Sequence, residues 1–287
     1  MIEQFLALDF RVIAIMSGFF GAIANIFARV LLKDIDSTKV SGLSFLIMGS
    51  VLLVFSPSFY FFTPTWAAIF LLYLISIVDA VGNYFYFKVF EKSEASIATS
   101  LLSISPFFAF IGSFLILGTN IPIMRLVLAF GIMITIALTT ADIKDFKRFS
   151  KQTLIPAVLA AACFGLSSIP SKILLTELGV INAPTLYMFR ATIIGMISLI
   201  IAKPNLRELK SRHYRLIVVR GLIVIATWVL MYYALTKGDS GVTSTLANIT
   251  PVFTLLLGGI FLKEQITKKK VTGILIVISL SLFMLYS

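Results

Sequence analysis

Hydrophobic residues run along the chain in long stretches that charged residues, prolines and glycines separate. A helix rises about 1.5 Å per residue, so about 20 apolar residues cross the roughly 30 Å hydrocarbon layer of a membrane. Backbone amides in lipid need partners within their own segment, and the alternating polarity of barrel strands is absent, so these stretches predict helices. The pattern predicts ten membrane-spanning helices, at about 12–32, 40–59, 66–87, 96–117, 125–141, 153–175, 184–202, 216–236, 241–262 and 271–286.

The composition agrees with an all-α polytopic membrane protein. Hydrophobic residues make up 59% of the 287 positions and charged residues 13%, whereas soluble domains have about 45–50% and about 25%. This excludes a soluble globular protein and a nucleic-acid-binding tail, although the net charge is +11. One cysteine (Cys163) and one histidine (His213) provide neither an internal disulfide nor a metal-ligand cluster. We expect no metal and no cofactor.

The lysines and arginines predict the orientation in the membrane. Of these 24 residues, 17 fall in alternate loops between the predicted spans, and three (Arg11, Arg125 and Lys237) fall on the opposite side. Loops rich in lysine and arginine stay in the cytoplasm, so both termini are predicted to be non-cytoplasmic. The membrane is expected to be the cytoplasmic (inner) membrane of a bacterium.

The two halves of the sequence resemble each other. At a shift of 145 residues, FKVFEKSEASIATSLLSISPFFAF (87–110) aligns with YYALTKGDSGVTSTLANITPVFTL (232–255), and Pro106 meets Pro251. Each half has five predicted spans, and because five is odd, the second copy is inverted relative to the first. Inverted repeats are common in secondary transporters, which bind substrate near the membrane midplane between the repeats. The predicted units are a first repeat at 1–144, a basic cytoplasmic connector at 145–152 and a second repeat at 153–287.

The second half carries the features of a known domain. Its stretch 232–283 has an aromatic-x-Ala-Leu start, a small-residue helix that reaches Pro251, a Phe-Leu-x-Glu close ending at Glu264, a basic loop and a final helix led by Gly273. This stretch resembles the end of an EamA domain, and Arg190 stands where such domains often carry an arginine. The first half is similar more loosely, since no acidic residue aligns with Glu264.

The resemblance is to the ten-helix branch of the drug/metabolite transporter superfamily and covers nearly the whole chain. It implies a ten-helix fold of two inverted five-helix EamA-like repeats and transport by alternating access. Members of this family have generally been described with cytoplasmic termini, which is opposite to the orientation that the charges of this chain predict. We follow the charges.

Ionisable residues inside a membrane are costly, so each one is a functional-site hypothesis. Among the acidic residues, Asp79 alone lies near the middle of a predicted span, where helical spacing places it on one face with Ser76, Asn83 and Tyr86. A carboxylate there can carry a proton or bind an ammonium group of a substrate. Alternatively, Asp79 pairs with a nearby lysine or arginine and fixes the packing of the helices.

Four cations also lie in or at the ends of the predicted spans. Arg190 is about two turns inside its span, where its planar guanidinium either holds a carboxylate or phosphate of the substrate or neutralises Asp79. Lys172 and Arg29 are aligned by the repeat and lie near span ends, where long cations reach the membrane surface. Lys172 is also a candidate binding residue. Arg220 starts its span and is predicted to be a cytoplasmic anchor.

Two spans contain a proline that follows a row of small polar residues. Ser103 and Asn248 align in the repeat, directly before Pro106 and Pro251. Small residues let helices approach closely without any substrate. A proline also frees the carbonyl about four residues upstream, and free carbonyls are tolerated where they line a cavity. Ser103 and Asn248 are therefore candidate substrate-binding residues.

Aromatic residues cluster on the span 216–236. Trp228 and Tyr232 are candidates for a wall that contacts a ring or a cation of the substrate. Tyr187 on the preceding span is placed either at the membrane surface or at a gate.

These features together predict a secondary transporter for a small organic metabolite, zwitterionic or anionic, such as an amino acid or a nucleotide-like compound. Transport is either proton-coupled or by exchange. The alternatives are an exporter of cationic drugs or amines, a non-transporting membrane scaffold, or a membrane-embedded enzyme. An enzyme needs several acids, bases or ligands around one cavity, and the spans contain too few. The expected partners are the substrate and the lipid bilayer, with no nucleic acid, as a monomer or a homodimer.

Overall fold

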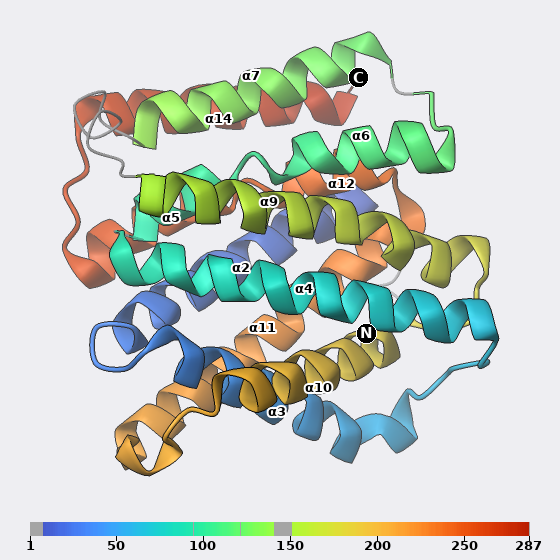
Figure 1. The fold of residues 1–287 in the computed structure, drawn as a ribbon. Coiled ribbons are helices and arrows are strands. Elements are labelled where there is room, and N and C mark those ends of the chain that lie inside the picture. Colours follow the sequence, from blue (N-terminus) through green and yellow to red (C-terminus); the bar gives the residue numbers. More distant parts are fainter. Residues whose placement is uncertain (1–7, 94, 121, 141–150, 287) are drawn as a thin grey trace.

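The computed structural model describes residues 8–93, 95–120, 122–140 and 151–286, and within these ranges the chain is built from helices. The helices run alongside one another, with α7 and α14 paired along one edge (Figure 1). The helices of the first half are α2 (Phe10–Leu31), α3 (Ser37–Phe55), α4 (Trp66–Lys92), α5 (Ala95–Leu102), α6 (Ser105–Leu117) and α7 (Ile123–Thr140). Those of the second half are α9 (Lys151–Lys172), α10 (Ala183–Ala202), α11 (Ser211–Lys237), α12 (Ser240–Ala247), α13 (Thr250–Leu257) and α14 (Lys268–Tyr286).

Short irregular elements join or extend these helices. Most of the predicted connector 145–152 lies outside the described residues. The 3-10 turns are Ser56–Ser58 and Leu206–Glu208, and the π-helical turns are Ile173–Glu177 after α9 and Gly258–Leu262 after α13.

The surface of the molecule is apolar, and many polar side chains lie inside. Trp66 is 88% exposed, and Phe55 and Ile201 are also largely exposed, whereas serines and threonines of several helices are buried. A water-soluble protein does not expose apolar area on this scale. The distribution fits a surface that faces lipid.

Among the described residues, seven helical segments are long and apolar enough to cross a membrane, and two further apolar stretches, Ser105–Leu117 and Leu126–Thr135, are shorter. The predicted span 96–117 is two helices in the structure, because α5 ends at Leu102 and α6 begins at Ser105. A proline at the start of α6 has no N–H to continue the helical hydrogen bonds. The described residues form an all-helical architecture with several candidate membrane spans. Ten membrane crossings remain a prediction.

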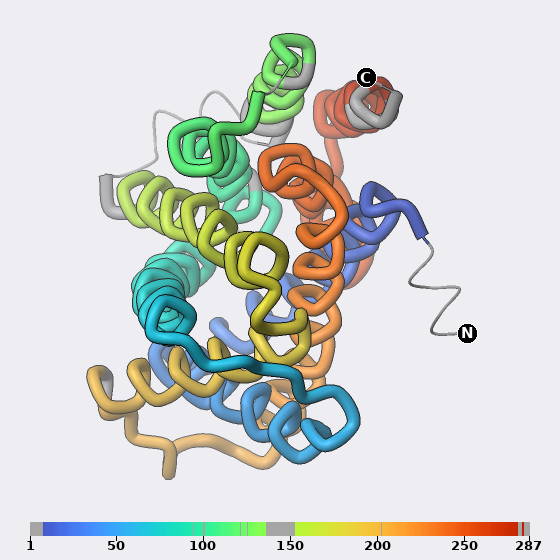
Figure 2. The backbone as a smooth tube through the Cα atoms, turned by 90° about the vertical axis from the view of Figure 1, so that its right-hand side faces the viewer, coloured from blue at the N-terminus to red at the C-terminus, as the bar shows by residue number. Residues whose placement is uncertain are grey.

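Helices of the two halves pair as a two-fold axis requires. By chain order α2 corresponds to α9 and α4 to α11, and in the structure α2 packs on α11 while α4 packs on α9. Two pairs join corresponding elements directly, α3 with α10 and α7 with α14. The broken helices cross instead: α5 corresponds to α12 and α6 to α13, but α5 packs on α13 and α6 on α12. Figure 2 looks along the helices and shows α7 and α14 at one edge of the bundle. The architecture is therefore one of two related repeats.

Corresponding helices run antiparallel. Gly42 of α3 lies against Leu199 of α10, and Gly49 lies against Thr192, so the residue numbers rise along one helix as they fall along the other. Antiparallel corresponding helices place one repeat upside down relative to the other.

Two glycines bring α3 and α10 into close contact. A methyl group added to Gly49 would lie 2.4 Å from the hydroxyl oxygen of Thr192, and one added to Gly195 would lie 2.6 Å from the backbone nitrogen of Leu46. Transmembrane helices are attracted mainly through close packing of this kind. The α3–α10 contact is thus set by the absence of side chains at these two positions.

The two repeats are also linked at both ends of α3. Beyond its C-terminus, the Thr63 N–H donates to the Val180 carbonyl (2.8 Å), next to the bridge between Phe62 and Ile181. At its N-terminus, Lys39 forms an ion pair with Glu208, and the hydrogen bond from Lys39 lowers the pKa of the Glu208 carboxyl. Each end therefore has its own link between the repeats.

We expect alanine at Gly49 or Gly195 to destabilise the protein, because the added methyl forces the backbones of α3 and α10 apart. Overpacking of this kind costs about 1–3 kcal/mol, which thermal unfolding of the purified protein in detergent would detect. Gly131→Ala is the matched control, since its methyl would meet only Leu280 at an ordinary 3.4 Å. Equal melting temperatures for the three variants would contradict the close-contact role.

Candidate functional site

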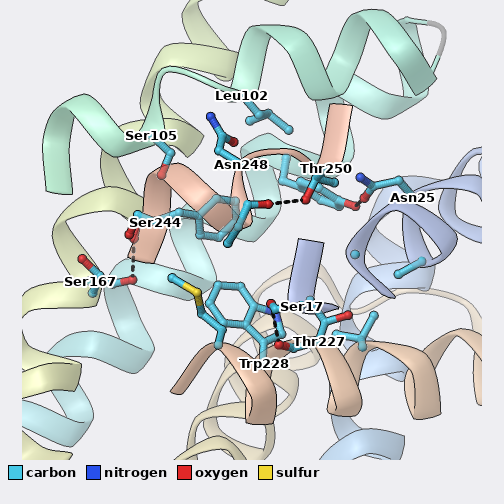
Figure 3. A pocket seen from close by; sticks show the side chains of 18 of the residues that line it. Ser17, Asn25, Leu102, Ser105, Ser167, Thr227, Trp228, Ser244, Asn248 and Thr250 are labelled. Atoms are coloured by element: carbon cyan, nitrogen blue, oxygen red, sulfur yellow. Dashed lines mark hydrogen bonds between the residues drawn. The ribbon is translucent and has the colours of Figure 1, made fainter. Parts of the chain in front are cut away.

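A cavity of about 220 Å³ lies inside the bundle, between the two repeats. Helices α2 to α6 and α9 to α13 all contribute residues to its wall, whereas none of the described side chains of α7 and α14 does. Polar and aromatic side chains from both halves point toward it, among them Asn25, Asn248 and Trp228 (Figure 3). The position between inverted repeats is where transporters of this plan bind substrate.

The breaks in two helices meet at this cavity. Between α12 and α13, the Asn248 side-chain amide donates to the Ser103 carbonyl in the break between α5 and α6, at 2.5 Å. The Thr250 hydroxyl donates to the Ala247 carbonyl (2.7 Å), which Pro251 leaves free. Asn248 lines the cavity, while Ser103 supplies its carbonyl to the break.

Gly18 of α2 makes room for this arrangement. A methyl group added there would lie 2.6 Å from the Ala247 carbonyl oxygen. The broken backbone of α12 and α13 therefore packs directly on the backbone of α2.

Asp79 and Arg190 form an ion pair in the interior. Asp79 of α4 is 3% exposed and Arg190 of α10 is 1% exposed, and the carboxylate contacts the guanidinium directly. The guanidinium also donates to the hydroxyls of Ser171 (2.9 Å) and Tyr232. Of the two hypotheses for Arg190, neutralisation of Asp79 is the one that the geometry shows. Asp79 itself does not line the cavity, whereas Asn83, on the next turn of α4, does.

Aromatic rings surround the guanidinium of Arg190. Its central carbon lies 5.1 Å from the centre of the Tyr232 ring and 5.8 Å from that of Trp228, and such contacts between a cation and a ring are attractive. Tyr187 stacks on Trp228 with a centroid distance of 6.3 Å. Tyr187 is buried, so the prediction of a place at the membrane surface is wrong, because its ring packs inside the bundle.

Tyr86 links the two repeats through Asn25. The Tyr86 hydroxyl donates to the Asn25 side-chain oxygen (2.6 Å), and the Asn25 amide lies 3.5 Å from the Thr254 hydroxyl of α13. Asn25 lines the cavity and was not among the residues that the sequence singled out. An isolated amide in an apolar span is a weak signal, because it is also common in packing contacts.

Lys172 and Arg29 occupy equivalent places, and each binds carbonyls at the C-terminal end of another helix. Arg29 donates to the carbonyls of Phe90 (2.9 Å) and Glu91 (3.3 Å) at the end of α4, and Lys172 donates to the carbonyl of Gly238 at the end of α11. Carbonyls at a helix C-terminus have no partner within the helix, and cations there complement the helix dipole. Neither residue lines the cavity in this structure. Lys172 caps a helix, and its part in substrate binding or coupling stays a prediction.

The position predicted for Arg220 is also wrong. It was predicted to be an anchor at the cytoplasmic surface, yet it is 4% exposed and lines the cavity. The reason is that α11 begins at Ser211, so Arg220 lies more than two turns inside this helix.

Metal binding finds no support in the described part of the chain, where no three His, Cys, Asp or Glu side chains come close enough to hold an ion. The cavity can bind a ligand through amides, hydroxyls, aromatic rings and guanidinium groups.

We expect the Asp79–Arg190 pair to behave as a unit in a double-mutant cycle. Asp79→Asn or Arg190→Gln alone leaves a buried charge without its partner, which costs about 3–5 kcal/mol. The double variant should regain most of the lost stability, measured as the melting temperature in detergent. Additive losses would show that the two charges do not stabilise each other.

Comparisons with known proteins agree with this description. Both halves match the EamA-like transporter family, at residues 11–141 and 152–286. The chain is 25% identical to uncharacterized protein MJ1333.1 of Methanocaldococcus jannaschii over 128 residues, which are 44% of this chain and 90% of that protein. A protein of known crystal structure shares the fold with a TM-score of 0.72 at 14% identity, over 93% of this chain and 94% of that one.

The two family matches correspond to the two structural repeats. MJ1333.1 is about as long as one of them, which indicates that one repeat is the unit of the family. The apolar helices and the family together identify an integral, multi-pass membrane protein of the drug/metabolite transporter type. The chain belongs to the EamA-like transporter family.

Proposed function

We propose that the protein is a secondary transporter that carries a small organic metabolite across the membrane by alternating access. The observation that carries this proposal is the cavity between the inverted repeats, to which both halves contribute amides, hydroxyls and aromatic rings. At about 220 Å³ it suits a ligand smaller than the drug-sized molecules that fill pockets of roughly 300–1,000 Å³. We propose a zwitterionic or anionic substrate, because the charged side chains on the cavity wall are arginines.

Alternating access requires contacts that open at one end while others close at the opposite end. The links at the two ends of α3 meet this requirement: the loop contact at Phe62 and Ile181 joins the repeats at one end, and the Lys39–Glu208 ion pair joins them at the other. We propose that the two links break in turn during transport.

The Asp79–Arg190 pair favours exchange over proton coupling through Asp79. Protonation of Asp79 would leave Arg190 as an uncompensated cation in the interior, and breaking a buried pair costs several kcal/mol. We therefore propose that substrate on one side is exchanged for substrate on the other. The exchange proposal would be contradicted if a pH gradient alone drove uptake and if this uptake were lost in Asp79→Asn.

The membrane proposed for this protein is the cytoplasmic membrane, with both termini outside and the predicted repeat units 1–144 and 153–287. The basis is the concentration of lysines and arginines in alternate loops.

Transport can be tested with two tryptophan variants. The chain has two tryptophans: Trp228 lines the cavity and Trp66 faces outward. We expect Trp228→Ala to reduce counterflow uptake into proteoliposomes at least about tenfold, since a contact of 1.4 kcal/mol corresponds to a factor of ten. Trp66→Ala is the matched control and should retain uptake.

The substrate for this assay comes from a thermal-shift screen of amino acids, organic acids and nucleotides. Equal uptake by both variants would place the substrate outside this cavity.

The orientation has a separate test. A fluorescent protein that matures only in the cytoplasm, fused to the C-terminus, should stay dark in cells, because the charge distribution places this terminus outside. Expression of the fusion is confirmed by immunoblot. Bright fluorescence would reverse the proposed orientation and leave the cavity unaffected.

A further inference from the structure

Arg220 is a buried cation for which the described residues provide no carboxylate. It lies on α11, lines the cavity and is 4% exposed, and no ion pair joins it to an acidic residue in the described part of the chain. Its Nε and Nη1 atoms are buried and have no hydrogen-bond partner among the described residues. A buried guanidinium keeps its charge, and leaving such a charge uncompensated is costly.

The surroundings of Arg220 hold the side chain in place without neutralising it. The Phe87 ring lies 5.0 Å from the guanidinium carbon, and the Tyr86 hydroxyl interacts with the guanidinium. Tyr86 is itself held by its hydrogen bond to Asn25. These neutral groups orient the guanidinium and leave its charge for a ligand.

The second arginine of the cavity differs in this respect. Arg190 is paired with Asp79 and bonded to two hydroxyls, so it contributes no net charge to the wall. The positive charge of the cavity therefore belongs to Arg220. An arginine offers parallel N–H groups that match the two oxygens of a carboxylate or a phosphate.

We propose that Arg220 binds the anionic group of the transported molecule, a carboxylate or a phosphate, and is the residue that sets the charge preference of the cavity. This rests on the proposed transport function. Arg220 and Trp228 lie eight residues apart on α11, about 12 Å along the helix, and both line the cavity. The anionic end of the ligand lies at Arg220, and its organic part extends toward Trp228.

The proposal can be tested by fluorescence without knowing the substrate. In a Trp66→Phe background, Trp228 is the single tryptophan and reports on the cavity. The probes are benzoate, phenyl phosphate and the neutral benzamide, titrated at constant ionic strength into the full-length protein in a neutral detergent. We expect saturable changes in Trp228 fluorescence, with the anions binding more tightly than benzamide. The tighter of the two anions identifies the preferred group.

Arg220→Gln should weaken binding of the preferred anion by about tenfold or more, because hydrogen bonds to charged groups are the strong ones. Benzamide binding should change less than about twofold. Arg215→Gln is the matched control: it removes an equal charge from an exposed position of the same helix and should leave the anion preference intact. The melting temperature without ligand should not fall in Arg220→Gln. If Arg220 were purely structural, its replacement would lower the melting temperature.

Several outcomes would overturn the inference. If Arg220→Gln retains the preference for anions, the anionic group binds elsewhere. A parent protein whose Trp228 responds to no anion would also refute the assignment. If only a short-chain phosphatidylglycerol binds and the small anions do not, the site holds a lipid headgroup. The proposed transport function is tested separately by counterflow uptake. Loss of uptake in Trp228→Ala and retention in Trp66→Ala would support transport through the cavity in each of these cases.

Discussion

The structure depends on one constraint: polar groups inside an apolar surface must find their partners within the protein. Helices meet this requirement along most of the chain, and the exceptions are resolved by particular side chains. The carbonyls at the ends of α4 and α11 bind Arg29 and Lys172. The break between α5 and α6 binds Asn248. The carboxylate of Asp79 binds Arg190. The irregular backbone is thus confined to places where another segment, or the cavity, adjoins it.

The backbone follows a two-fold plan, but the chemistry inside the cavity does not. Arg29 and Lys172 are aligned in the repeat and cap corresponding helices, and Ser103 and Asn248 meet across corresponding breaks. In contrast, Asp79, Arg190 and Arg220 have no charged counterpart at the aligned positions of the other repeat. A symmetric scaffold suits motion between two opposite orientations. A ligand with an anionic end is itself asymmetric, and a cavity with its charge on one wall suits such a ligand.

The sequence was sufficient for the helices, the repeat and the family, because these follow from patterns repeated over many residues. It was less informative about single side chains. The sequence pattern predicts a surface position for Arg220 because the predicted span begins only four residues before it, whereas α11 begins earlier, at Ser211. Lys172 donates to the carbonyl of Gly238, and this contact joins residues 66 positions apart. Local sequence carries no signal for such a distant partner.

The sequence by itself determined that this chain spans the membrane and which few charged residues lie within its spans. Burying a charge in lipid is costly, so such residues are rare and are easily recognised in an apolar sequence. Only the tertiary structure decided how these charges are compensated. Asp79 and Arg190 are 111 positions apart, and their pairing arises from the packing of α4 against α10. Because Asp79 and Arg190 neutralise each other, the remaining cation on the cavity wall, Arg220, is the charge that is left to bind a ligand. An ion pair depends on distances of a few ångströms, which helix packing sets and the order of residues does not.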